Sequence, residues 1–149
     1  MVPAESPGVI GTTSLGPESE KAEYSNYGTG PADVAAPGGN GTTGDCATTI
    51  LSTIPGNAYL CIQGTSMASP HAAGVAALIV SQYGSVGRDG DVKLSPQRVE
   101  AYLQGTTIDI GLSGYDECFG HGRIDALRAV THDTAGQFEP TPLCAEYTD

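Results

Sequence analysis

One serine of this chain lies where a short extended segment meets a hydrophobic helix. Ser66 is the third residue of the string GTSMASPH, residues 64–71. Residues 59–62 (YLCI) have the aromatic and β-branched character of a strand, and Gly64 permits a sharp turn. Residues 72–80 are all apolar or glycine, which predicts a helix that is buried on every side.

The N-terminus of a helix suits chemistry in which negative charge develops. Its first N–H groups have no partner inside the helix, and the helix dipole is positive at that end. Ser66 in this position can attack a carbonyl carbon while its own N–H stabilises the oxyanion that forms. The simpler interpretation is that Ser66 only caps the helix, because serine is a preferred N-cap residue.

The string around Ser66 resembles the nucleophile segment of the subtilisin-like serine proteases. The similarity runs from about residue 9 to residue 130, and its blocks are residues 24–28, 33–38, 52–57, 71–79 and 120–126. The nucleophile elbow of the α/β-hydrolases, Gly-x-Ser-x-Gly, fits less well, because Ala68 stands where that motif needs its second glycine.

The resemblance implies an α/β fold in which a mostly parallel sheet is flanked by helices. Residues 1–130 are then the C-terminal part of a peptidase domain, and residues 131–149 a polar tail or linker. Ser66 is the expected nucleophile of an endopeptidase that cleaves extended protein or peptide substrates through an acyl-enzyme. The resemblance also implies that Thr65 supports the oxyanion region and that Met67 lines the leaving-group side of the cleft.

A serine nucleophile needs a base, usually a histidine that a carboxylate orients, and the three histidines of this chain do not suit that role. His71 lies about 140° around the helix axis from Ser66, so we expect it to be packed or hydrogen-bonded. His121 lies between two glycines in a turn, and His132 ends a short helix that begins near Asp125. In the family, the histidine, the aspartate and an oxyanion asparagine come from earlier segments. We therefore expect the N-terminal half of the same domain as a partner and the isolated chain to be inactive.

Two other interpretations stay open. The first is a secreted binding module that retains the fold without the activity, and the second is a missing half that another chain supplies. No cofactor is expected. Asp116 and Glu117 suggest a calcium site or a general acid, but two carboxylates in a loop are usually just solvated, so no metal site is expected there.

Composition and cysteines favour a secreted globular protein. The net charge of −11, from 17 acidic and 6 basic residues, argues against binding to nucleic acid or to anionic membranes. No apolar run is long enough to cross a bilayer. The four cysteines include no C-x-x-C pair, which favours disulfides over zinc. Three pairings are possible, and the simplest joins Cys46 to Cys61 and Cys118 to Cys144.

The remaining elements follow from turn residues and apolar spacing. Asp125 is expected to cap the last helix. A second helix should begin after Ser95 with Pro96 at its first position, end at Gly105, and present an apolar face that includes Leu103. Strands are expected at 9–15 and 33–36, a hairpin from 48–54 and 59–62, a glycine-rich surface loop at 38–44, and a break at 84–90.

Overall fold

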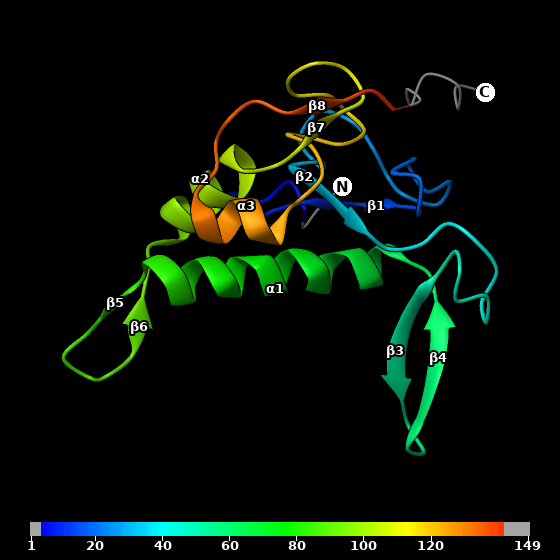
Figure 1. The fold of residues 1–149 in the computed structure, drawn as a ribbon, viewed down its shortest axis with the longest axis horizontal. Helices are drawn as coiled ribbons and strands as arrows, with labels where there is room; N and C mark the ends of the chain where they lie inside the picture. The colour runs from blue at the N-terminus through cyan, green and yellow to red at the C-terminus, as the bar shows by residue number, and fades with distance from the viewer. Residues whose placement is uncertain (1–3, 142–149) are drawn as a thin grey trace.

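A computed structural model describes residues 4–141 of the chain (Figure 1). Its helices are α1 (Thr65–Tyr83), α2 (Pro96–Gly105) and α3 (Ala126–Thr131). Its strands are β1 (Thr12–Leu15), β2 (Val34–Pro37), β3 (Ile50–Ile54), β4 (Ala58–Ile62), β5 (Ser85–Val86), β6 (Val92–Lys93), β7 (Asp109–Ile110) and β8 (Phe138–Glu139). None of the helices within residues 4–141 combines the length and the apolar character that a membrane span requires.

The strands β1 and β2 form a parallel pair that supports α1. Their register runs from Thr12 opposite Val34 to Leu15 opposite Pro37. Successive side chains of a strand point to opposite faces, and β2 shows this directly. Val34 packs in the cluster beneath α1, whereas its neighbour Ala35 packs in a second cluster on the other face. The α/β character that the sequence predicts is therefore confirmed, with a sheet between two apolar layers.

Two apolar clusters hold these layers together. The cluster between β2, α1, α2 and α3 consists of Val34, Ala72, Val75, Ile79, Leu103 and Ala129. The cluster on the opposite face consists of Leu15, Ala35, Ile108, Ile110, Cys118 and Phe119. Both lie close to β2, which places this strand at the centre of the described residues.

The long helix α1 is covered on one side only. It packs against β1, β2, α2 and α3, and its buried residues include Ala72, Val75 and Ile79. Apart from two hairpins at its ends, the other described elements lie on that one side in Figure 1. The expected burial on every side is wrong for these residues, because no described element reaches the opposite face, where Gly74 and Leu78 are exposed.

Two antiparallel hairpins flank α1. The predicted hairpin is confirmed as β3 and β4, paired from Ile50 with Ile62 to Ile54 with Ala58. Its turn contains Gly56 at φ 87°, a left-handed conformation that favours glycine. The second hairpin, β5 and β6, begins within residues 84–90, where only a break was expected, and ends just after them. Its strands have two residues each, too short for a periodic pattern to reveal.

The predicted helix starts are also present. Ser95 is the N-cap of α2, with Pro96 in its first turn, although the Ser95 side chain makes no capping hydrogen bond. Asp125 is the N-cap of α3, and its side chain accepts a hydrogen bond from the Arg128 N–H at 2.9 Å. Leu103 of α2 is buried, as its place on the apolar face predicts.

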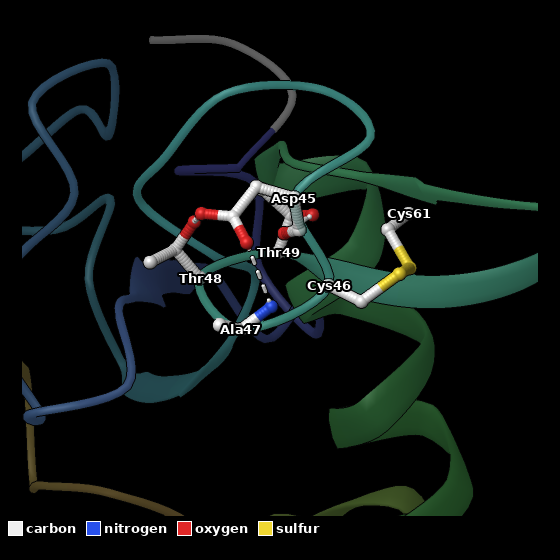
Figure 2. The surroundings of a disulfide bond; sticks show 6 residues. All are labelled: Asp45, Cys46, Ala47, Thr48, Thr49 and Cys61. Atoms are coloured by element: carbon white, nitrogen blue, oxygen red, sulfur yellow. Dashed lines mark hydrogen bonds between the residues drawn. A yellow bond between two sulfur atoms is a disulfide. The ribbon is translucent and has the colours of Figure 1, made fainter.

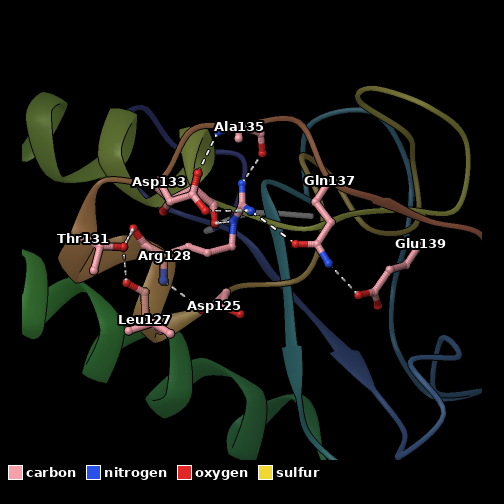
Figure 3. A network of polar contacts seen from close by, with 9 residues as sticks. Asp125, Leu127, Arg128, Thr131, Asp133, Ala135, Gln137 and Glu139 are labelled. Carbon is pink, nitrogen blue, oxygen red and sulfur yellow. Dashed lines mark hydrogen bonds and ion pairs between the residues drawn. The ribbon is translucent and has the colours of Figure 1, made fainter.

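Arg128 attaches the segment after α3 to the body of the molecule (Figure 3). Its buried guanidinium donates to the Thr106 carbonyl at 3.1 Å and to the side chains of Asp133 and Gln137, each at 3.3 Å. Beyond it, β8 pairs in parallel with β7. Residues 133–139 thus have defined contacts, and the division into residues 1–130 and a tail at 131–149 stays a prediction.

Candidate active site

Ser66 lies in the first turn of α1 with its side chain exposed. The N-cap is Gly64, and no side chain makes a capping hydrogen bond at this helix start. The interpretation of Ser66 as a simple cap is therefore wrong. Gly64 has φ 153° and ψ 158°, a combination that is essentially restricted to glycine, and this turn directs the chain from β4 into the helix.

The first turn of α1 contains the backbone N–H groups of Ser66, Met67 and Ala68. The N–H groups of Met67 and Ala68 both donate to the Gly64 carbonyl, at 2.9 and 3.3 Å. The N–H of Ser66 comes before them in the first turn, where no carbonyl of the helix itself can accept it. Together with the positive end of the helix dipole, this arrangement favours an anion next to the hydroxyl.

The loop after β2 fixes the position of this turn. The Gly38 carbonyl accepts hydrogen bonds from the Gly64 N–H at 2.9 Å and from the Tyr24 hydroxyl at 3.0 Å. The Gly38 N–H donates to the Leu15 carbonyl at 3.0 Å at the end of β1. A Cβ atom at position 38 would lie only 2.7 Å from the Gly64 carbonyl oxygen, so the close approach requires glycine.

A disulfide holds the next part of the same loop against β4 (Figure 2). Cys46 and Cys61 are bonded across a separation of 15 residues, which confirms this half of the expected pairing. Cys61 is buried, and its carbonyl accepts a hydrogen bond from the Gly44 N–H at 2.7 Å. The other expected disulfide, between Cys118 and Cys144, stays a prediction. Cys118 is disulfide-bonded, and Cys144 lies outside the described residues.

The turn at Asp45 orders the residues beside the disulfide. Its carboxylate accepts hydrogen bonds from the Thr48 hydroxyl at 2.7 Å and from the Ala47 N–H at 3.0 Å (Figure 2). These two bonds stabilise the charged form and lower the pKa of Asp45 below its ordinary value. The loop between β2 and β3 is therefore fixed at Gly38, at Asp45 and at Cys46.

The three histidines lie elsewhere, as expected. The His71 ring donates from Nδ1 to the Met67 carbonyl at 2.8 Å, one helical turn back. The His121 ring packs edge-on against Tyr115, with centroids 5.4 Å apart, and His132 packs against Tyr102 at 4.5 Å. Among residues 4–141, no histidine is hydrogen-bonded to Ser66.

The other residues that the sequence analysis considered are Thr65, Met67 and Asp116. Thr65 and Met67 flank Ser66 and are half-buried, and their proposed roles stay predictions. Asp116 is buried rather than solvated, because its carboxylate accepts the N–H groups of Cys118 and Phe119, both at 2.8 Å, within its own loop. Over the described part of the chain, no group of three or more acidic, histidine or cysteine side chains could hold a metal ion.

Sequence reasoning did not single out Tyr24 and Gly38 as parts of the site. Both lie in blocks that resemble the family, residues 24–28 and 33–38, and this was the available signal. The Gly38 carbonyl accepts the Gly64 N–H across more than twenty residues, and the Tyr24 hydroxyl donates to that same carbonyl. No local pattern encodes such contacts.

Comparison with known proteins shows the family of this chain. A model described as the subtilase family matches residues 1–122. Halolysin of Haloferax mediterranei is 39% identical over 124 residues, which are 83% of this chain and 20% of that protein. The halolysin-like extracellular serine protease of Natrialba magadii is 37% identical over 131 residues, again 20% of its length and 88% of this chain.

A solved structure of a protease from Pseudoalteromonas arctica superposes on the chain with a TM-score of 0.70 at 36% identity. The match covers 88% of this chain and 38% of that one. The chain thus spans between a fifth and two fifths of the length of the relatives named here. Because the family model matches most of the chain and the fold agrees, this protein belongs to the subtilase family.

Proposed function

We propose that the chain supplies the nucleophile of a secreted serine endopeptidase, with Ser66 as the acylated residue. The observation that supports this most directly is the exposed Ser66 hydroxyl at the start of α1, where the Ser66 N–H has no acceptor within the helix and the helix dipole favours an anion. Secretion is supported by the disulfide between Cys46 and Cys61, since such bonds persist in oxidising surroundings.

In the proposed reaction, the Ser66 oxygen attacks the scissile carbonyl carbon and its proton passes to a base. The carbonyl oxygen becomes an oxyanion, which the Ser66 N–H stabilises as one of its donors. The C–N bond then breaks, the base gives the proton to the leaving amine, and an acyl-enzyme ester remains. Water hydrolyses this ester in the same two stages, which frees the acid and restores the hydroxyl.

We further propose that the base, its orienting carboxylate and a second oxyanion donor belong to a segment of the same domain outside these residues. The exposed apolar side of α1, with Ala73, Gly74, Ala77 and Leu78, gives such a segment a surface to pack against. A helix with this many uncharged residues is typical of a domain interior. Without that segment, a serine and a backbone donor retain only a small part of the rate enhancement.

The test uses a serine-directed fluorophosphonate on the complete protein. Labelling should occur in the natural protein and in Ser69→Ala, a matched control that removes another exposed hydroxyl one turn along α1. It should disappear in Ser66→Ala. Labelling that survives Ser66→Ala would contradict the proposal, and absence of labelling in the natural protein would favour a binding module that keeps only the fold.

A further inference from the structure

A polar cavity lies beside the turn that carries Ser66. Its volume is about 560 Å³, and it is lined by Glu23, Tyr24, Asn40, Gly41 and Gln63. Gln63 directly precedes Gly64, so one wall of the cavity belongs to the same stretch of backbone as the nucleophile. A substrate bound at Ser66 in an extended conformation therefore places a neighbouring side chain within reach of this cavity.

The polar walls of the cavity are held by hydrogen bonds. The Tyr24 hydroxyl donates to the Gly38 carbonyl at 3.0 Å, in the loop that contacts Gly64. The Gln63 Oε1 accepts the Gly41 N–H at 2.6 Å, which leaves the Gln63 amino group as a donor. Asn40 Oδ1 accepts the Glu23 N–H at 3.4 Å. The cavity is therefore formed before a ligand arrives.

Glu23 is the charged residue of the lining, and its side chain is exposed. A second carboxylate lies just behind, because Asn40 Nδ2 donates to Glu20 at 3.3 Å. The nearby cation is turned inward: the buried Lys21 ammonium donates to the carbonyls of Ala22 at 2.9 Å and Ser25 at 2.8 Å. Burial lowers the pKa of Lys21, and the Glu23 carboxylate counteracts that shift. The charge that the cavity presents to a ligand is negative.

We infer that this cavity is a substrate subsite in which Glu23 selects a lysine or arginine side chain next to the scissile bond. This inference rests on the proposed function and adds a substrate preference to it. A cationic side chain of this length can enter the cavity, place its charge near Glu23 and keep its aliphatic part against the Tyr24 ring. An acidic side chain would meet like charge at the same place.

The first experiment measures cleavage by the complete protease with a peptide library that varies each position on both sides of the scissile bond. One position should prefer lysine and arginine over glutamine. Glu23→Gln should reduce that preference about five-fold, the effect of losing an exposed ion pair worth ~1 kcal/mol. Glu23→Lys should invert it in favour of acidic residues.

The matched control is Asp91→Asn, which removes the same charge beside β6. This hairpin lies at the end of α1 opposite to Ser66 (Figure 1), so the preference should stay as in the natural protein. An unchanged preference in Glu23→Gln, or no preference for basic residues at any position, would overturn the inference.

A second measurement does not depend on catalysis. Peptides with lysine or glutamine at the selected position are titrated into the complete protein carrying Ser66→Ala, with and without Glu23→Gln. The lysine peptide should bind about five-fold more tightly, and only when Glu23 is present. Equal binding of both peptides would refute the subsite, whereas failure of the natural protein to cleave any peptide would refute the proposed function instead.

Discussion

The contact between Gly38 and Gly64 gives the sharpest test of how the site is positioned. A Cβ atom added in Gly38→Ala would lie 2.0 Å from the Ser14 hydroxyl oxygen and 2.7 Å from the Gly64 carbonyl oxygen. Ser14 is fully buried and its hydroxyl is hydrogen-bonded to Tyr24 at 2.7 Å, so it cannot simply turn away. The other close atom, the Gly64 carbonyl oxygen, belongs to the backbone. The substitution must therefore move one strand end or the turn itself.

The cost can be worked out in two parts. Overpacking of a buried site destabilises a protein by about 1–3 kcal/mol, and the contact with a backbone oxygen places Gly38→Ala in the upper part of that range. The Gly64 carbonyl also accepts the N–H groups of Met67 and Ala68, so its displacement moves the start of α1. A shift of about 1 Å at a nucleophile reduces the rate by roughly a hundredfold.

The assay separates stability from activity. Unfolding by denaturant is measured in the complete protein carrying Ser66→Ala, which prevents self-digestion, and the rate of fluorophosphonate labelling is measured with Ser66 intact. The control is Gly105→Ala at the end of α2, where an added Cβ meets no atom within 4 Å. That variant should be unchanged or up to about 1 kcal/mol more stable. A Gly38→Ala protein that matches Gly105→Ala in both stability and labelling rate would refute the reasoning.

Three further predictions concern the surroundings of the site. Replacing Cys46 and Cys61 together by alanine should lower the free energy of unfolding by about 3 kcal/mol, the value expected for closing a 15-residue loop, as measured by denaturant titration. Because the pKa of Asp45 is lowered in the folded protein, the Asp45 carboxylate contributes fully to the free energy of unfolding above the ordinary aspartate pKa. This contribution is lost as the pH falls through the lowered pKa. Asp45→Asn should remove that part of the acid dependence in a stability profile against pH. Asp116→Ala should cost about 3 kcal/mol, because buried N–H groups lose their acceptor, whereas Asp116→Asn keeps one acceptor oxygen and should cost less.

Each of these has a clear contrary result. A cysteine-free variant that unfolds at the same denaturant concentration would show that the loop is held by its hydrogen bonds alone. If Asp45→Asn loses stability at acidic pH in the same way as the natural protein, other carboxylates account for the acid sensitivity. Equal losses for Asp116→Ala and Asp116→Asn would mean that the oxygen acceptors do not account for the role of this buried residue.

Local sequence patterns were sufficient to predict several of the helices and strands. Pro55-Gly56 between two β-rich runs predicted the hairpin, Ser95-Pro96 predicted the start of α2, and Asp125 predicted the start of α3. These features depend on residues close in sequence, so the chain encodes them directly. The short pairs β5–β6 and β7–β8 escaped prediction because strands of two residues have no usable period.

The sequence alone determined the local setting of Ser66, the nucleophile that we propose: a serine after a glycine turn at the start of an apolar helix, with a cysteine pair close by. Only the tertiary structure decided what surrounds Ser66. The loop at Gly38 lies against Gly64, Glu23 comes to the same cavity as Gln63, and one side of α1 is left uncovered. The physical reason is that these contacts join distant segments through packing and backbone hydrogen bonds. Many different sequences can form such contacts, so no short motif predicts them.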